Sequence, residues 1–173
     1  MQTVKTERVL RILIGILLVV LGYVIVDSFE ERIVVVGDTA PDFTVTTDSG
    51  RQVTRSDFGG KLLVLNFWAT WCPPCVEEMP SLDQFQKRLA GDGVVVLGVS
   101  VDKSEQAYRQ FLRKAKVSFL TARNPSAEIS AEYGTFKYPE TYLIDGRGKV
   151  VLKHIGPRDW SDERLINEIR SLL

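Results

Sequence analysis

Side chains that bind metals or form disulfides are scarce in this sequence. Only two cysteines, Cys72 and Cys75, and one histidine, His154, occur among its 173 residues. A closed structural zinc site takes four Cys or His ligands, so one chain falls short of such a site and we expect no metal centre. The sequence also lacks the Met-rich segment or second histidine that would support a copper-carrying or haem-handling dithiol.

An excess of charge of either sign is missing as well. Lys+Arg and Asp+Glu both number 22, so no overall basic field would attract nucleic acid, and we expect no nucleic-acid partner. The 45% hydrophobic and 25% charged residues are typical of a globular protein. The length suits one domain with a short appendage.

The two cysteines stand at a junction between two contrasting segments. An apolar run, residues 62–68, precedes them, and a stretch with helical period, residues 76–89, follows. At a strand-to-helix junction Cys72 would lie at the helix N-terminus, where free N–H groups and the macrodipole stabilise a thiolate. Cys75 would lie one turn further in. We predict a redox-active disulfide without any other cofactor, because a two-residue spacer closes too small a loop for a purely structural staple.

A long uncharged apolar run lies near the N-terminus. It covers residues 12–26 and extends back to Val9 if Arg11 is included. A membrane-spanning helix needs about 20 such residues, with ~17 as a lower limit, and an arginine near the end can reach the headgroups. We therefore predict that residues 9–26 contact membrane lipid and that residues 1–31 form a cytoplasmic stub and a signal-anchor transmembrane segment.

The charges around this run predict its orientation. Three basic residues precede it and three acidic ones follow it: Lys5, Arg8, Arg11, Asp27, Glu30 and Glu31. The positive-inside rule places the N-terminus in the cytoplasm and the rest of the chain on the extracytoplasmic, periplasmic side of the cytoplasmic membrane. A cleaved signal peptide is the alternative, but residues 23–27 offer no pair of small residues for cleavage.

The pattern of residues 32–173 predicts one α/β domain. Strands are expected at residues 43–46, 52–54, 62–68, 94–101, 117–121, 141–144 and 149–155. Helices are expected at residues 76–89 and after the capping residues Ser104, Asn124 and Ser161. The order gives a mixed sheet flanked by helices, with an N-terminal β-hairpin. Residues 62–68 are so uniformly apolar that they suit a central strand covered on both faces.

Several motifs together resemble a known family. The stretch from Phe67 to Cys75, with Pro80 after it, resembles the active site of the thioredoxin superfamily. Other features are similar to the membrane-anchored TlpA/ResA/CcmG (DsbE) group of extracytoplasmic thiol-disulfide oxidoreductases: Ala40-Pro41-Asp42-Phe43, the hairpin, Glu78-Met79-Pro80 and an insertion from Lys103 to Tyr133. Tyr138-Pro139-Glu140-Thr141 is typical of the CcmG branch. The resemblance covers residues 36–173 and implies a thioredoxin-like order of strands and helices.

The resemblance implies catalytic roles for four residues. Cys72 matches the exposed attacking cysteine and Cys75 the buried resolving one. Pro139 matches a cis-proline that faces the disulfide, and its loop would hold the partner polypeptide as an extra strand. Glu78 matches the active-site glutamate of the ResA/CcmG group. Glu78 would replace the buried proton-relaying aspartate of thioredoxin, because that position is Asn66 here and an amide does not titrate.

Other residues are expected around this centre. Substrate contacts are expected from Trp71, Pro73, Pro74, Tyr138 and Glu140. Glu140 has two open interpretations, an active-site acid or a residue on the loop surface. His154 is expected to be a solvated strand residue, and Trp68 is expected in the core.

The implied function is reduction of protein disulfides. By likeness to the family, the substrate would be the oxidised Cys-x-x-Cys-His site of apocytochrome c, and a membrane dithiol donor of the CcdA/DsbD type would reduce the enzyme again. No histidine separates the cysteines, so we expect a reductant with a potential nearer ~−270 mV than ~−120 mV. A general cell-envelope disulfide reductase, a peroxiredoxin and a dithiol metal- or haem-binding module are alternatives. Ala69 counts against a peroxiredoxin, which needs Thr or Ser at that position.

Overall fold

The computed structural model describes residues 11–23 and 33–173. The chain divides into two units, Met1–Arg32 and Ile33–Leu173. In the first unit, residues 11–23 are helical and exposed. No helix in the described part of the chain is long and apolar enough to cross a membrane. Both ends of the predicted anchor and the predicted cytoplasmic stub lie outside the described residues, so the anchor stays a prediction.

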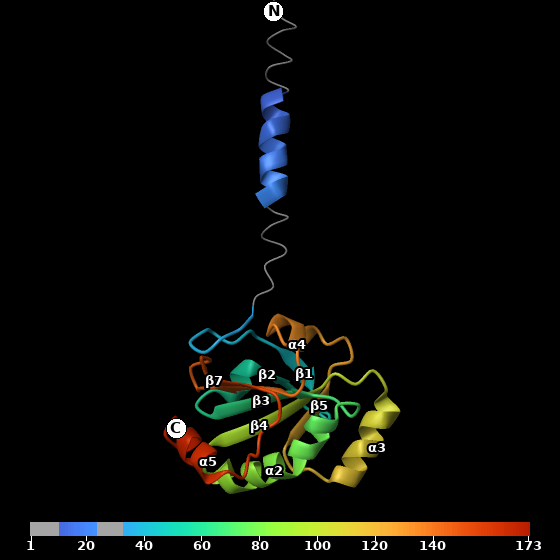
Figure 1. The fold of residues 1–173 in the computed structure, drawn as a ribbon, viewed down its shortest axis with the longest axis vertical. Coiled ribbons are helices and arrows are strands. Elements are labelled where there is room, and N and C mark those ends of the chain that lie inside the picture. Colours follow the sequence, from blue (N-terminus) through green and yellow to red (C-terminus); the bar gives the residue numbers. More distant parts are fainter. Residues whose placement is uncertain (1–10, 24–32) are drawn as a thin grey trace, which may run out of the picture. The chain divides into compact units, whose positions relative to one another are not determined.

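The second unit has an α/β architecture (Figure 1). Its strands are β1 (Thr44–Thr46), β2 (Gln52–Thr54), β3 (Leu62–Trp68), β4 (Val94–Ser100), β5 (Leu120–Arg123), β6 (Glu140–Ile144) and β7 (Val150–Ile155). Its α-helices are α2 (Pro73–Leu89), α3 (Glu105–Ala115), α4 (Glu128–Glu132) and α5 (Glu163–Arg170). Two short 3-10 helices, η1 (Arg55–Phe58) and η2 (Ala90–Asp92), complete it.

The main sheet is mixed, and β3 is its central strand. The strand order is β5-β4-β3-β6-β7. β3 and β5 run parallel to β4, whereas β6 is antiparallel to both β3 and β7. Every residue of β3 is buried, as its uniformly apolar sequence predicts. β1 and β2 form a separate antiparallel hairpin, so the expected N-terminal hairpin is confirmed.

Alternate residues of β3 serve two apolar layers on opposite faces of the sheet. Val64 and Trp68 belong to a cluster that includes α2, α5 and part of α3. Leu65 and Phe67 belong to a second cluster with the hairpin and α4. Figure 1 shows these elements on the two sides of the sheet. Because side chains alternate along a strand, Asn66 faces α2, and this position matters for the site.

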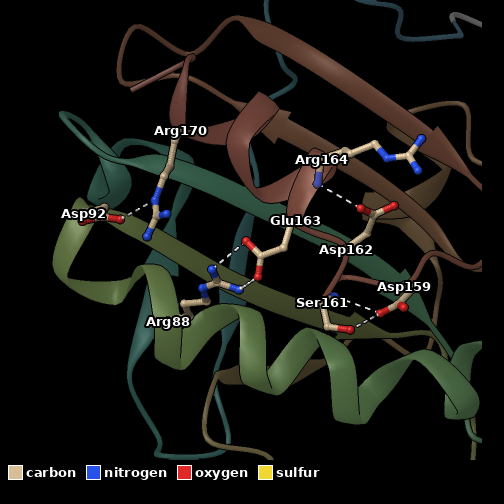
Figure 2. Close-up of polar contacts among 8 residues, drawn as sticks. All are labelled: Arg88, Asp92, Asp159, Ser161, Asp162, Glu163, Arg164 and Arg170. Atoms are coloured by element: carbon tan, nitrogen blue, oxygen red, sulfur yellow. Dashed lines mark hydrogen bonds and ion pairs between the residues drawn. The ribbon is translucent and has the colours of Figure 1, made fainter.

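Helix α5 packs beside α2, and Figure 2 shows the polar contacts along this packing. The Arg88 guanidinium donates to both carboxylate oxygens of Glu163, at 2.5 and 2.8 Å. Arg170 lies 3.3 Å from Asp92. Such exposed pairs contribute little to stability, because water screens their charges. The attachment of α5 therefore rests mainly on its buried apolar residues, which are Leu165, Ile166 and Ile169.

The N-cap of α5 differs from the prediction by one residue. Asp162 is the cap, and its carboxylate accepts a hydrogen bond from the Arg164 backbone N–H at 2.9 Å. Ser161 instead donates its hydroxyl to Asp159 (Figure 2). The two candidates are adjacent and both cap helices well, so local sequence does not separate them.

The strand and helix of the insertion also begin later than expected. Asp83 of α2 accepts hydrogen bonds from the backbone N–H and the hydroxyl of Ser118. Ser118 is thereby bound to α2 ahead of β5, which begins at Leu120. Asn124 does not cap α4 directly; Ala127 is the N-cap residue. The Asn124 side chain accepts from the Ile129 N–H at 3.1 Å and so closes the turn before the helix.

Candidate active site

The two cysteines form a disulfide where β3 leads into α2. Cys72 is the N-cap residue, and Pro73 and Pro74 occupy the first helical positions. Proline suits this place because the first N–H groups of a helix have no intrahelical acceptor. The Cys72 carbonyl accepts from the N–H groups of Cys75 and Val76, both at 3.1 Å. The first sulfur therefore lies at a helix N-terminus, as the sequence predicts.

The two cysteines differ in their access to solvent. In the disulfide, Cys72 keeps 5% of its surface exposed, whereas Cys75 is completely buried. The exposure of Cys72 is smaller than expected for an attacking cysteine. A partner can still reach only one end of the disulfide, and that end is Cys72.

Aromatic and proline residues form the surface beside Cys72. Trp71 is 62% exposed, and its ring meets Tyr138 edge-on at 6.0 Å. The Tyr138 hydroxyl lies 3.1 Å from Ser130 Oγ. The Tyr138–Pro139 peptide bond is cis, and the Pro139 carbonyl accepts from Gly156 N–H at 2.8 Å. Trp71 and the predicted cis-proline loop thus adjoin each other. Among the other predicted contacts, Pro73 is exposed and Pro74 half-buried.

Glu78 lies one helical turn after Cys75 and is 4% exposed. Its Oε1 accepts from Asn66 Nδ2 at 2.9 Å. Its Oε2 accepts from the Arg158 backbone N–H at 3.0 Å and from Trp160 Nε1 at 3.3 Å. Burial raises the pKa of Glu78 to about 6, and the hydrogen bonds from Arg158, Asn66 and Trp160 act in the opposite direction. Glu78 can therefore change its charge near neutral pH.

A row of polar residues crosses the sheet on the face below α2. Asn66, Thr141 and His154 are neighbours in register on β3, β6 and β7. His154 was expected to be solvated, and that expectation is wrong, because only 8% of it is exposed. Its ring meets Trp160 edge-on at 6.0 Å. Burial lowers the pKa of His154, which keeps the imidazole neutral at neutral pH.

Glu140 requires a correction. It is fully buried and pairs with Lys153, whose Nζ lies 2.9 Å from Oε1. The Tyr142 hydroxyl donates to the same oxygen at 2.5 Å. Tyr142 belongs to the cluster on the hairpin face, so this carboxylate lies on the opposite face of the sheet from Glu78. Glu140 is thus not on the loop surface, and its buried side chain presents no atom to a substrate.

Asp102 is an important residue that sequence reasoning missed. Its carboxylate accepts from the backbone N–H of Thr70 at 2.9 Å and from the Thr70 hydroxyl at 2.6 Å. It also accepts from the Ser100 hydroxyl at 2.6 Å. These bonds fix the loop two residues before Cys72. A signal was present in the sequence. Asp102 comes two residues after the end of β4 and Thr70 two residues after the end of β3, and the carboxyl ends of neighbouring parallel strands lie at the same edge of a sheet.

Trp160 and Arg158 were also missed. Both donate to Glu78 from the loop between β7 and α5, far from the cysteines in sequence. Neither forms part of a local motif around the cysteine pair, so no spacing rule could connect them to Glu78.

The arrangement is suited to exchange between thiols and disulfides. It combines a disulfide accessible at one sulfur, a helix N-terminus beside that sulfur, and a buried carboxyl group that titrates near neutrality. The thioredoxin-like fold and this site define a thiol-disulfide oxidoreductase, and the comparisons with known proteins agree.

Residues 36–153 match the AhpC/TSA family, and the chain belongs to this thioredoxin-like family. The thiol-disulfide oxidoreductase ResA of Bacillus thuringiensis subsp. konkukian is 31% identical over 150 residues, covering 85% of this chain and 87% of ResA. The thioredoxin-like protein YneN of Bacillus subtilis is 37% identical over 153 residues, with 83% and 89% covered. The predicted resemblance to the ResA group is confirmed.

A solved structure gives the same result. The crystal structure of a protein from Chlorobium tepidum, described as a putative thiol:disulfide interchange protein DsbE, has a TM-score of 0.73 and 34% sequence identity. It matches 80% of this chain and 96% of its own. The similarity therefore extends over nearly the whole of that protein, including the fold around the cysteine pair.

Proposed function

We propose that this chain is a membrane-anchored, extracytoplasmic reductase of protein disulfides, with apocytochrome c as its client. The observation that carries the reductase proposal is the pairing of one accessible sulfur, Cys72, with a buried sulfur, Cys75, one turn from a buried carboxyl group, Glu78. The first sulfur can meet a partner, and the second can react only with the first.

The reaction begins with the reduced enzyme. The Cys72 thiolate attacks one sulfur of the partner disulfide, the partner's S–S bond breaks, and the departing partner thiolate takes a proton. Cys75 then loses its proton to Glu78 and attacks Cys72. This step breaks the mixed disulfide, forms the Cys72–Cys75 disulfide and releases the second partner thiolate, which is protonated in turn. The partner gains two electrons and two protons. The enzyme supplies both electrons. One proton leaves Cys72 for solvent when its thiolate forms, the other passes from Cys75 through Glu78 to solvent, and solvent protonates the two partner thiolates.

Glu78 suits the role of proton acceptor because its charge is not fixed by a cation. Its described hydrogen-bond donors are neutral groups, and its pKa of about 6 lies close to the working pH. A carboxylate held in an ion pair would bind a proton only at much lower pH.

The surface beside Cys72 would receive the partner chain. Trp71 offers exposed aromatic surface, and the half-buried Tyr138 meets it edge-on and leads into the buried, cis-bonded Pro139. An extended partner segment could lie along this loop with its disulfide against Cys72. Pro73 and Pro74 would border this surface at the start of α2.

Direction and regeneration follow from the chemistry of the pair. The residues between the cysteines are prolines, which do not stabilise a thiolate as a histidine would, so we infer a reducing potential nearer ~−270 mV. A membrane dithiol donor of the CcdA/DsbD type would return the disulfide to the dithiol. The uncharged run up to Val26 and the charges around it support a single-pass anchor at residues 9–26, with the catalytic domain on the periplasmic side.

The client is tested with matched peptides. Reduced protein is mixed with an oxidised Cys-x-x-Cys-His peptide, and with a peptide of the same composition whose cysteines are spaced differently. Faster stopped-flow reduction of the first peptide is expected from an enzyme for apocytochrome c. Equal rates would instead support a general envelope reductase. Consumption of hydrogen peroxide at a comparable rate would favour a peroxiredoxin, although Ala69 offers no hydroxyl at the required position.

The order of the two cysteines is tested by trapping. Cys75→Ala should accumulate mixed disulfides with partner peptide, because Cys72 attacks and nothing resolves the product. Cys72→Ala is the matched control and should trap little, since its remaining thiol is buried. Equal trapping by the two variants, measured by mass spectrometry, would reverse or remove the assignment.

The role of Glu78 is tested across pH. Glu78→Gln keeps the shape and removes the titration, so resolution of the mixed disulfide should slow by roughly 10-fold to 100-fold, at or below the lower limit of the ~10²–10⁴-fold typical of general bases. The rate is measured by stopped flow against pH for both proteins. Superimposable profiles would show that the proton leaves by another route.

A further inference from the structure

Asn66 has partners for its amide nitrogen but, among the residues that the structure describes, none for its amide oxygen. Nδ2 donates to Glu78 Oε1 and to Thr141 Oγ1, each at 2.9 Å. Oδ1 has no hydrogen-bond partner in this part of the chain, and the whole residue is buried. Buried polar atoms are normally paired, and each exception has a physical cause. The unpaired oxygen adjoins the one carboxyl group in the site that can change its charge.

The two oxygens of Glu78 face different kinds of group. Oε2 receives the Trp160 indole N–H and the Arg158 backbone N–H. Both groups can only donate, so a proton on Oε2 would point at other protons. A proton bound by Glu78 therefore belongs on Oε1. There it meets Asn66 Nδ2, which is also a donor in the present orientation. Protonated Glu78 needs an acceptor at this place.

We propose that Asn66 is a positioning residue whose amide reverses when Glu78 gains or loses a proton. Half a turn about the Cβ–Cγ bond exchanges Nδ2 and Oδ1, so that Oδ1 accepts the proton of Oε1. The Thr141 hydroxyl, which now accepts from Nδ2, then donates to Oδ1, since a hydroxyl can do both. One amide group of Asn66 stays unpaired in either orientation. The amide therefore supports both charge states of Glu78.

The other groups around Glu78 do not offer this adjustment. The titratable or charged ones are Cys75 on the same helix, His154 on β7 and Arg158 in the loop before α5. Cys75 is held in the disulfide. His154 is absent from the described hydrogen-bond partners of Glu78, although its own Nε2 is also unpaired in the described part of the chain. Arg158 reaches the carboxylate through its backbone. The row formed by Asn66 and Thr141 remains as the adjustable part of the site.

The proposal gives a reason for an amide where thioredoxin has an aspartate. A carboxylate at position 66 would lie about as close to Glu78 as Nδ2 does, at 2.9 Å. Two negative charges at that distance cannot both persist in a buried site, so one of them would stay protonated. An amide has no charge and can still turn either end towards Glu78. The proton site is thereby confined to a single residue.

The inference rests on the proposed function, in which Glu78 holds the proton of Cys75, but its test does not use turnover. The pKa of Glu78 is measured in the oxidised full chain by 13C NMR of the side-chain carboxyl. Trp160→Phe removes a group that only donates, so the pKa should rise by roughly one pH unit. Asn66→Leu removes a group that serves both charge states, so the pKa should change by less than about half of that.

If the pKa of Glu78 rises equally in Asn66→Leu and in Trp160→Phe, the proposal is overturned, because Asn66 would then be a fixed donor to the carboxylate. The unmodified protein gives a second measurement if Asn66→Leu does not fold. In 15N-labelled protein the side-chain amide protons of Asn66 should shift with the same midpoint as the Glu78 carboxyl. An Asn66 amide that keeps its signals and its contact with Thr141 through the titration would also overturn it.

Failure of the proposed function gives a different pattern. If the protein does not reduce disulfides, or if Glu78→Gln leaves the rate profile unchanged, the NMR titration of Glu78 and Asn66 still reports on the amide. The two ideas can therefore fail separately.

Discussion

Glu78 and Glu140 are both buried carboxyl groups next to the active site, but on opposite faces of the sheet. Glu78 receives hydrogen bonds from an amide, an indole and a backbone N–H. Glu140 receives the Lys153 ammonium and the Tyr142 hydroxyl. Glu140 has a cation to balance its charge, whereas the described partners of Glu78 are all neutral. The fold thus places a cation beside one buried carboxyl and only neutral donors, among the described residues, beside the other.

The ion pair of Glu140 also connects distant parts of the domain. Lys153 Nζ donates to the Val34 carbonyl at 2.9 Å as well as contacting Glu140. The Tyr142 hydroxyl lies 2.9 Å from the Tyr133 carbonyl. Glu140 follows the cis-proline directly, so the pair holds the base of that loop against the start of the folded unit. The two carboxyls thus differ between a structural use, in Glu140, and the chemical use that we propose for Glu78.

The largest effect is expected when the structural carboxyl, Glu140, loses the cation that pairs with it. Lys153→Met keeps the bulk of the side chain and leaves Glu140 buried without its cation. The free energy of unfolding should fall by about 3–5 kcal/mol, as for other buried pairs that lose one partner. Urea unfolding followed by circular dichroism measures it.

The double variant Lys153→Met with Glu140→Gln is the control, because it removes both charges together. It should recover most of the stability lost in Lys153→Met. A double variant as unstable as Lys153→Met alone would show that lost packing, and not an unpaired charge, causes the effect.

An intermediate effect is expected at the chemical carboxyl. The pKa of Glu78 is raised from 4.5 to about 6 on folding. Its contribution to stability is therefore fully present below pH 4.5 and is lost as the pH rises through 6. Position 78 does not titrate in Glu78→Gln. The free energy of unfolding of this variant minus that of the wild type should therefore be about 2 kcal/mol larger above neutral pH than it is near pH 4.

The measurement is the free energy of unfolding in urea across this pH range for both proteins. The unpaired oxygen of Asn66 can turn towards the new amide, so the substitution should not disturb packing. A difference between the two proteins that stays constant with pH would mean that Glu78 has the same pKa in the folded and unfolded chain.

The smallest effect is expected at an ion pair on the surface, which shows how much burial matters to the pair of Glu140. Arg88 and Glu163 form a bidentate pair like those used in cores, but their side chains are 41% and 64% exposed. Glu163→Gln should lower the free energy of unfolding far less than Lys153→Met does, and by still less at high salt, because water and ions screen exposed charges. A loss as large as that of Lys153→Met would mean that bonding geometry, and not burial, sets the value of these pairs.

The sequence predicts the parts of the site that depend on local pattern. The apolar run at residues 62–68 identifies the central strand, and the spacing of Cys72 and Cys75 before a helical period places the disulfide at a helix N-terminus. Glu78 follows from the same helix, one turn further on. In each case the deciding interactions lie within one or two elements, which a periodic pattern can describe.

The parts that fail depend on contacts between distant segments. Glu140 is ambiguous in the sequence because no local pattern indicates that Lys153 will pair with it. His154 looks solvated in the sequence because Trp160, which packs against its ring, comes from a later loop. The displaced start of β5 arises in the same way, since Asp83 of α2 binds Ser118. Tertiary pairing decides these positions, and local propensity does not contain it.

Residues 39–47 contact both edges of the main sheet. β5 and β7 are its two edge strands. Thr47 forms a bridge with Ala122 on β5, and Thr39 forms one with Lys149, directly before β7. An open edge is a template on which another chain can add as a strand.

Both margins are thus partly covered by one short stretch of chain, residues 39–47. By bridging to both edge strands, this stretch leaves less open strand on which a second copy of the chain could pair, and so guards the domain against edge-to-edge aggregation.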